Sequence, residues 1–235
     1  MNASLFAVLG LGVLMGMQHA TEADHLAAIA TLAAREQSLW RGLRHGVAWG
    51  LGHTLMLLLV AGGIGLLGWV ISPELAGRFE QVVGAMLIVL GAHLAWRLYR
   101  ERFHFHGHLH GDSAHFHGHS HRPAPGMPPP PHRGDPHRHP HHLPLRSMAV
   151  GMVHGLAGSA ALALLISQRM PTPAWGLLYI ALFGLGSIAG MAVLSGALAM
   201  PMGLLARHLT MAYRALNIVA AACSVVLGAT MVIGP

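Results

Sequence analysis

Long uncharged runs of apolar residues alternate with short polar segments along most of the chain. A helix needs about 20 mostly apolar residues to cross a hydrocarbon core of about 30 Å. Six runs meet this condition: residues 3–34, 45–71, about 80–99, about 147–167, 174–200 and about 208–233. Pro73, Pro171, Pro173 and Pro201 fall between these runs, where residues that interrupt helices are expected. The pattern therefore predicts an all-α polytopic membrane protein with six transmembrane helices.

The first run is too long for one straight span, and polar residues lie at its centre. At a rise of 1.5 Å per residue, residues 3–34 would extend about 48 Å. The central stretch contains two imidazoles and two carboxylates, those of His19, Glu22, Asp24 and His25. Ionisable side chains are costly in hydrocarbon and usually mark a substrate or ion pathway. We therefore expect the helix to break between Gln18 and Asp24 and to carry a site; the alternative is a His–Asp pair that only joins two helices.

The spacing within this stretch bears on which carboxylate accompanies the histidines. On a regular helix His19, Glu22 and His25 are three residues apart and share one face. Asp24 then points about 100° away from His25, which makes Glu22 the better metal ligand and Asp24 a hydrogen-bond partner of a ligand. If the chain is unwound here, Asp24 can coordinate as well. Histidine and carboxylate together suit divalent transition metals better than magnesium or calcium.

Two further histidines lie inside spans at a similar depth. His53 is eight residues from the start of the second span, His154 seven from the start of the fourth, and His25 nine from the end of the first. These separations correspond to about 10–13 Å along each helix. The predicted metal site therefore comprises His19, Glu22, Asp24, His25, His53 and His154. His45 and His208 lie at span ends and are interpreted as interfacial, and His93 is left out of the site.

Composition supports the membrane interpretation and gives it an orientation. Of the 235 residues 54% are hydrophobic and 9% are charged, whereas a soluble domain carries about 25% charged residues. Every basic residue is arginine and most lie near span ends or in the loops, so the net charge of +6 does not indicate nucleic-acid binding. With six spans, twelve arginines fall on one side of the membrane and two on the other. The positive-inside rule makes the first side cytoplasmic and places both termini outside.

Residues 102–146 differ from the rest of the chain because they contain thirteen of the twenty histidines and no apolar periodicity. We interpret this segment as a disordered cytoplasmic loop with the histidine-rich composition typical of auxiliary metal binding. A solubilising tether is the alternative. The candidate ligands are His104, His106, His108, His110, His115, His117, His119 and His121. Their imidazoles bind metal when neutral, so the loop is expected to release metal as the pH falls through about 6.5.

The two parts of the chain that flank this loop resemble each other. Gly16-Met17-Gln18-His19 recurs as Gly151-Met152-Val153-His154, and three predicted spans follow from each start. An odd number of spans places the second half upside down relative to the first, which predicts a 3+3 inverted repeat of the kind found in secondary transporters. Chance similarity between glycine-rich helices is the alternative. The expected organisation is a membrane half at 1–101, the loop at 102–146 and a second membrane half at 147–235.

Three motifs together resemble a known family. The residues from His19 to His25 match the H-x4-D-H signature of the nickel/cobalt transporter (NiCoT) family. Leu51-Gly52-His53-Thr54 is similar to the second motif of that family. Residues 152–161, Met-Val-His-Gly-Leu-Ala-Gly-Ser-Ala-Ala, look most like the UreH-type nickel permeases associated with urease.

This resemblance implies nickel or cobalt uptake across a bacterial cytoplasmic membrane. It implies that His19, Asp24, His25 and His53 are metal-pathway residues, together with His154. The metal is then the transported substrate, and no resident cofactor is expected. The expected partners are the divalent metal ion, the lipid bilayer and a cytoplasmic nickel chaperone or urease or hydrogenase maturation protein, with no nucleic acid.

Two other functions stay open at this point. Nickel/cobalt efflux proteins also carry a long cytoplasmic histidine-rich loop, although their first motif resembles H-G-x-x-x-G-H and lacks the aspartate. A membrane metal sensor or buffer built around the loop is a further alternative. An intramembrane metalloprotease would need an H-E-x-x-H helix, and no histidine in this chain is followed directly by glutamate. We therefore expect a transporter rather than an enzyme.

Overall fold

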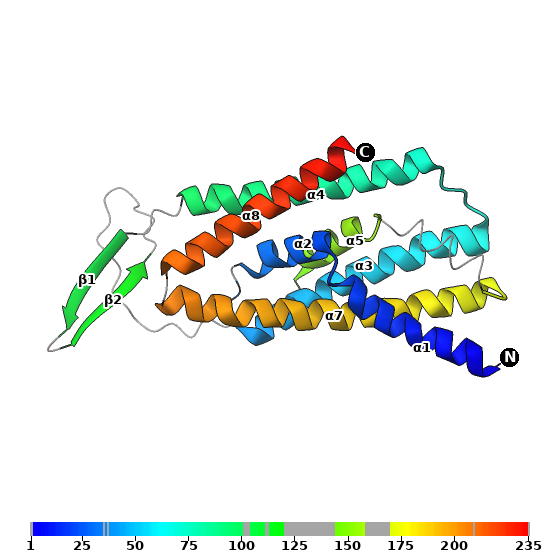
Figure 1. The fold of residues 1–235 in the computed structure, drawn as a ribbon, viewed down its shortest axis with the longest axis horizontal. Helices are drawn as coiled ribbons and strands as arrows, with labels where there is room; N and C mark the ends of the chain where they lie inside the picture. Colours follow the sequence, from blue (N-terminus) through cyan, green and yellow to red (C-terminus); the bar gives the residue numbers. More distant parts are fainter. Residues whose placement is uncertain are drawn as a thin grey trace.

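The computed structural model describes residues 2–34, 36, 38–100, 104–110, 113–119, 144–157, 170–208 and 210–234. Within these ranges the chain forms a helical bundle with one two-stranded hairpin at one end (Figure 1). The helices are α1 (Asn2–His19), α2 (Ala23–Ala33), α3 (Leu39–Leu67), α4 (Pro73–Arg100), α5 (Leu145–His154), α7 (Pro173–His208) and α8 (Thr210–Ile233). The strands are β1 (His104–His110) and β2 (Ser113–His119).

Four of these helices are long and apolar enough to cross a membrane, so the protein is a helical membrane protein. The candidate spans are Leu39–Leu67, Pro73–Arg100, Pro173–Met202 and Met211–Ile233. α1 contributes a shorter apolar stretch, Ala7–His19. Within the described ranges, four of the six predicted spans are therefore present at full length. The first is divided between α1 and α2, and part of the fourth lies outside the described residues.

Three helix boundaries differ from the prediction, each for a local reason. Pro201 was expected to lie between spans, but it lies inside α7, which continues to His208. A membrane helix tolerates an internal proline because neighbouring helices and side chains can satisfy the freed backbone groups. α3 begins at Leu39 and α4 at Pro73, before the predicted starts, because both helices extend beyond their uncharged runs into polar first turns. Proline is common at the first position of a helix, as in α4.

Two antiparallel helix pairs build the bundle, and the shorter helices lie among them (Figure 1). α3 packs along α7, and α4 packs along α8. α1 also packs against α7, and α5 packs against α3. Both termini lie at one end, here called the terminal end, and the hairpin lies at the opposite, hairpin end. This arrangement places α2 and α5 between the two pairs.

Glycines allow the helices around α3 and α7 to approach each other closely. A β-carbon at Gly52 would collide with the backbone of Met148 on α5, and one at Gly186 with the backbone of Val13 on α1. Small residues are common at such contacts because lipid supplies no hydrophobic force between helices, so that close packing must hold them together. The polar residues on these helices are thereby brought into one place.

The hairpin lies inside the segment that was predicted to be disordered. β1 and β2 are antiparallel, and their register sets residues 104, 106 and 108 opposite residues 119, 117 and 115, all of them histidines. The prediction relied on the absence of apolar periodicity, but histidine alternates here with glycine, alanine and apolar residues at the two-residue period of a strand. For residues 104–110 and 113–119 the structure therefore has a hairpin. The other loop residues up to 143 lie outside the described part, and α5 already begins at Leu145.

Candidate metal centre

The first predicted span is interrupted between His19 and Ala23, as expected from its length and its polar centre. α1 ends in a turn in which the backbone N–H of Glu22 donates to the carbonyl of His19 at 3.1 Å. Thr21 donates both its N–H and its hydroxyl to the carbonyl of Gln18, at 2.8 and 2.6 Å. Glu22 is extended, and α2 starts immediately after it. The break therefore places the side chains of His19 and of residues 24–25 at the ends of two separate helices.

Four imidazoles from α1, α2, α3 and α5 converge beside this break. The ring centroid of His25 lies 4.3 Å from that of His19, 5.2 Å from that of His53 and 4.2 Å from that of His154. One ring nitrogen from each of His19, His25 and His53 lies within 4.8 Å of the others. His25, His53 and His154 are buried. The structure thus brings together all four histidines that the sequence assigned to the site.

Asp24 connects two of these histidines. Its Oδ2 accepts from Nε2 of His154 at 2.9 Å, and its Oδ1 lies 2.9 Å from Nδ1 of His25. The backbone N–H of His25 also donates to Oδ1 at 2.9 Å. Carboxylate bonds of this kind fix the orientation and tautomer of a metal-binding histidine. They leave Nε2 of His25 and Nδ1 of His154 directed away from the carboxylate.

Glu22 lies at the edge of the cluster. Its Oε1 is 2.8 Å from Nδ1 of His19, and its side chain is 58% exposed, compared with 22% for Asp24. The preference for Glu22 as a ligand applied to a regular helix, whereas the interrupted chain brings Asp24 among the buried imidazoles. Asp24, His25 and His154 form a second group whose ligand atoms lie within 4.8 Å of one another.

The free nitrogens define what the cluster can do chemically. Both nitrogens of His53, Nε2 of His25 and Nδ1 of His154 are buried without a hydrogen-bond partner among the described residues. A buried polar group left unpaired costs about 1–3 kcal/mol. A divalent cation would satisfy several of these nitrogens at once, because neutral imidazole is a preferred ligand of nickel, cobalt, zinc and copper. The cluster therefore has the donor set and the burial of a transition-metal site.

Three residues that were not assigned to the site border the cluster. The Trp49 ring is buried 5.5 Å from the ring of His25 and 5.4 Å from that of His154. The Phe183 ring lies 5.3 Å from that of His19. Ser187 is fully buried, and its hydroxyl has no hydrogen-bond partner within the described ranges. Only Trp49 had a signal in the sequence, because it lies four residues from His53 and therefore on the same face of α3.

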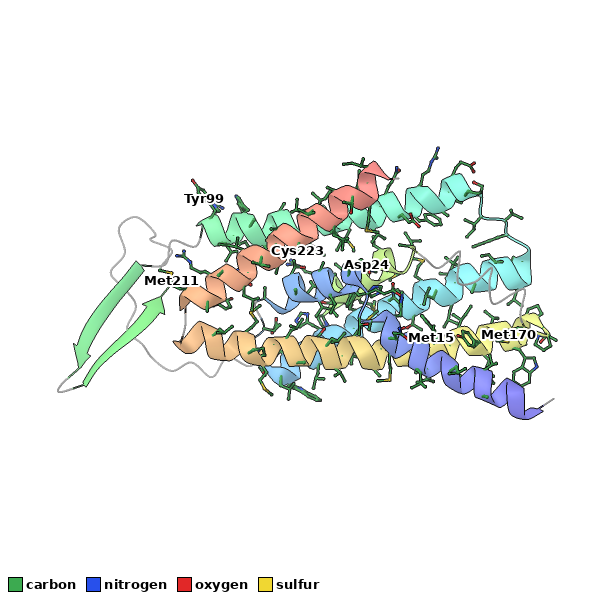
Figure 2. The ribbon with its side chains drawn as sticks, viewed as in Figure 1. Met15, Asp24, Tyr99, Met170, Met211 and Cys223 are labelled. Carbon is green, nitrogen blue, oxygen red and sulfur yellow. The ribbon has the colours of Figure 1, made fainter. Side chains whose placement is uncertain are left out.

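The cluster lies at mid-length in the bundle. Figure 2 shows Asp24 between Met211, near the hairpin end, and Met170, near the terminal end. A cavity of about 330 Å³ lies toward the terminal end, between the last turns of α3 and the start of α7. It reaches Ile180, which is three residues from Phe183, and Ala61, which is eight residues from His53. A route from this end to the cluster therefore passes Phe183.

The histidines assigned to auxiliary metal binding lie away from the cluster. Seven of them, His104, His106, His108, His110, His115, His117 and His119, belong to β1 and β2 at the hairpin end (Figure 1). His121 lies outside the described residues. The structure therefore separates the loop histidines from the buried ones.

A helical membrane protein with a buried histidine–carboxylate cluster is the class that this fold and geometry define. Over 210 residues the chain is 33% identical to the urease accessory protein UreH of Bacillus sp. (strain TB-90), an alignment that covers 88% of this chain and 83% of that relative. The chain therefore belongs to the UreH-like family of nickel/cobalt transporters. No family model matches the chain, and no solved structure matches it.

Proposed function

We propose that this protein takes up nickel or cobalt across the bacterial cytoplasmic membrane through the cluster of His19, Asp24, His25, His53 and His154. The observation that carries the proposal is the convergence of four imidazoles and one carboxylate from four helices of a membrane bundle. The metal is cargo in this proposal, so no resident cofactor and no reaction on the metal are involved. Membership of a family that includes a urease accessory protein supports nickel as the cargo and a nickel chaperone or maturation protein as the cytoplasmic recipient.

The packing supports an inverted repeat that relates the two halves. Gly16 on α1 faces the carbonyl of Phe183 on α7, and Gly151 on α5 faces the carbonyl of Trp49 on α3. Gly16 and Gly151 are 135 residues apart, and Trp49 and Phe183 are 134 apart, so the repeat exchanges one contact for the other. The pairings α1 with α7 and α5 with α3 are exchanged in the same way. Such repeats commonly place the substrate at their interface near the bilayer midplane.

The same relation gives the cluster two aromatic boundaries. His19 has the Phe183 ring at 5.3 Å, and His154 has the Trp49 ring at 5.4 Å. We infer that Phe183 and Trp49 separate the metal from the two sides of the membrane, and that moving one ring at a time gives alternating access. Ser187 occupies the position 134 residues after His53, so its buried hydroxyl is a further oxygen donor at the repeat interface.

The experiment is metal flux in proteoliposomes of known orientation, measured for nickel and for cobalt with and without a pH gradient. We expect inward movement in the physiological orientation and loss of flux in His25→Ala. His93→Ala is the matched control, because His93 is an exposed membrane-helix histidine outside the cluster, and it should transport normally. Flux only in the outward direction would replace uptake with efflux, and metal binding without flux in either direction would favour a sensor or buffer.

A further inference from the structure

The contact between α3 and α5 continues from the histidine cluster toward the hairpin end, where it carries a second group of ligand-type side chains. His45, Trp49 and His53 are four residues apart on α3 and lie on one face of that helix. Nδ1 of His45 lies 2.7 Å from the hydroxyl of Ser147, in the first turns of α5. Eight residues, or about 12 Å along α3, separate His45 from His53.

Glu36, in the connection between α2 and α3, completes this group. Its Oε1 lies 3.3 Å from Nε2 of His45, and its Oε2 lies 3.6 Å from Nε of Arg41. The Glu36 side chain is 15% exposed and that of His45 is 30% exposed, so solvent reaches a partly shielded pair. Two donors 3.3 Å apart, each about 2.1 Å from a metal, would subtend about 105° at the metal. That angle lies between the cis angle of an octahedron and the tetrahedral angle.

We propose that Glu36 and His45 form a second binding site for the transported divalent metal, at the hairpin-end mouth of the pathway. This inference rests on the proposed transport function. Trp49, which is buried against His25 and His154, separates the mouth site from the central cluster. The Ser147 hydroxyl holds Nδ1 of His45, so that Nε2 faces the carboxylate, as a hydrogen-bond partner orients a metal-binding histidine. Arg41 is 59% exposed, and its guanidinium can turn into solvent when the cation arrives.

The terminal-end mouth offers no equivalent. The repeat relates His45 to Tyr179, 134 residues later, and Tyr179 packs against Gly12 on α1. The cavity at that end is lined by residues without an imidazole or carboxylate: Ala61, Ile64, Gly65, Met170, Pro171, Thr172, Pro173, Gly176, Leu177 and Ile180. The mouth site therefore makes the two sides of the pathway different, and it adjoins the end that carries the histidine hairpin.

A cysteine at position 45 tests direct binding without interference from the loop histidines. In a Cys223→Ala background, His45→Cys titrated with Co²⁺ should give a thiolate-to-cobalt charge-transfer band, because thiolate is a ligand of such metals. The band should disappear when Glu36→Ala is added and persist when His25→Ala is added. His93→Cys in the same background is the control and should give no band. Absence of the band in folded His45→Cys, or its persistence without Glu36, would overturn the proposal.

Glu36→Gln provides a second measurement in the otherwise native chain. When metal is presented to the hairpin side of oriented proteoliposomes, the apparent KM should rise roughly tenfold or more, the scale of losing a ligand or its support. When metal is presented to the terminal side, the KM should stay at the wild-type value. An equal change on both sides would mean that Glu36 only anchors the α2–α3 connection. The cobalt band without any flux would refute transport but retain the mouth site, whereas normal flux without the band and without a side-dependent KM would refute the mouth site alone.

Discussion

The α4–α8 pair and the helices around α3 and α7 pack by the same rule but treat their buried polar groups differently. Gly84 and Gly228 face each other across α4 and α8, as Gly52 faces the backbone of α5. On α8 the hydroxyl of Ser224 donates to the carbonyl of Ala27 at 3.1 Å, and that of Tyr213 donates to the carbonyl of Ala34 at 2.8 Å. These hydroxyls dock α8 on α2 and leave no donor free.

The histidine cluster shows the opposite arrangement. Four imidazole nitrogens of His25, His53 and His154 are buried without a hydrogen-bond partner within the described residues, against one amide oxygen, that of Asn217, on α8. A hydrogen-bonded polar group in a membrane bundle stabilises the docking of helices, whereas an unpaired one costs free energy. The difference teaches that unpaired nitrogens, rather than polarity as such, distinguish the substrate site from the scaffold.

The largest expected effect comes from removing His53 and comparing the result with a change on α8. His53→Leu should abolish flux while leaving the metal-free protein as stable as wild type or more stable, because an unpaired group worth about 1–3 kcal/mol is removed. Ser224→Ala should have the reverse effects, losing about 1 kcal/mol of stability and keeping its flux. Flux and the denaturant midpoint of both variants provide the test. A His53→Leu protein that transports metal normally would remove the distinction between site and scaffold.

A smaller effect is expected from matched glycine substitutions in the two regions. Gly52→Ala should push α5 away from α3 and separate His154 from Asp24, and an error of about 1 Å in such a geometry can cost on the order of 100-fold in rate. Gly84→Ala should loosen α4 from α8 and lower stability, with the KM for metal unchanged. Gly62→Ala is the control on α3, because a β-carbon there meets nothing within 4 Å. Equal losses of transport in Gly52→Ala and Gly84→Ala would contradict the assignment of the two regions.

The smallest effect is expected from the histidine-rich segment. Deleting residues 104–142 should leave flux intact at saturating metal and change it mainly at low metal, because tethered sites raise the local metal concentration at one mouth. Initial rates over a range of nickel concentrations would measure this. Loss of flux at every concentration, in protein that is folded and inserted, would make the loop part of the path itself.

Much of the site could be predicted from the sequence, because its residues lie in membrane helices where ionisable groups are conspicuous. The length of residues 3–34 and the polar stretch at their centre predicted the break between His19 and Ala23. The similar depths of His25, His53 and His154 in their helices predicted that these imidazoles could meet. The choice between Glu22 and Asp24 depended on the local backbone, so it stayed open until the break was located.

The remaining features depend on contacts that no local pattern reports. His45 was interpreted as interfacial because its partner Ser147 is 102 residues away, and only the α3–α5 contact brings Glu36 into relation with the pathway. The α7 helix passes through Pro201 because the surrounding bundle supports it, which helix propensity alone does not indicate. The hairpin was missed because a composition-based argument for disorder did not consider the period-two alternation of its histidines.

The central claim is that the transported metal binds among the buried imidazoles rather than on the loop histidines alone. Anomalous diffraction at the nickel absorption edge, from crystals of the full chain loaded with Ni²⁺, locates the metal directly. The account predicts an anomalous peak within bonding distance, about 2.0–2.2 Å, of nitrogens of His25 and His53, with His19, His154 or Asp24 completing the coordination. Peaks confined to the histidine-rich segment, with none in the cluster at saturating nickel, would contradict it.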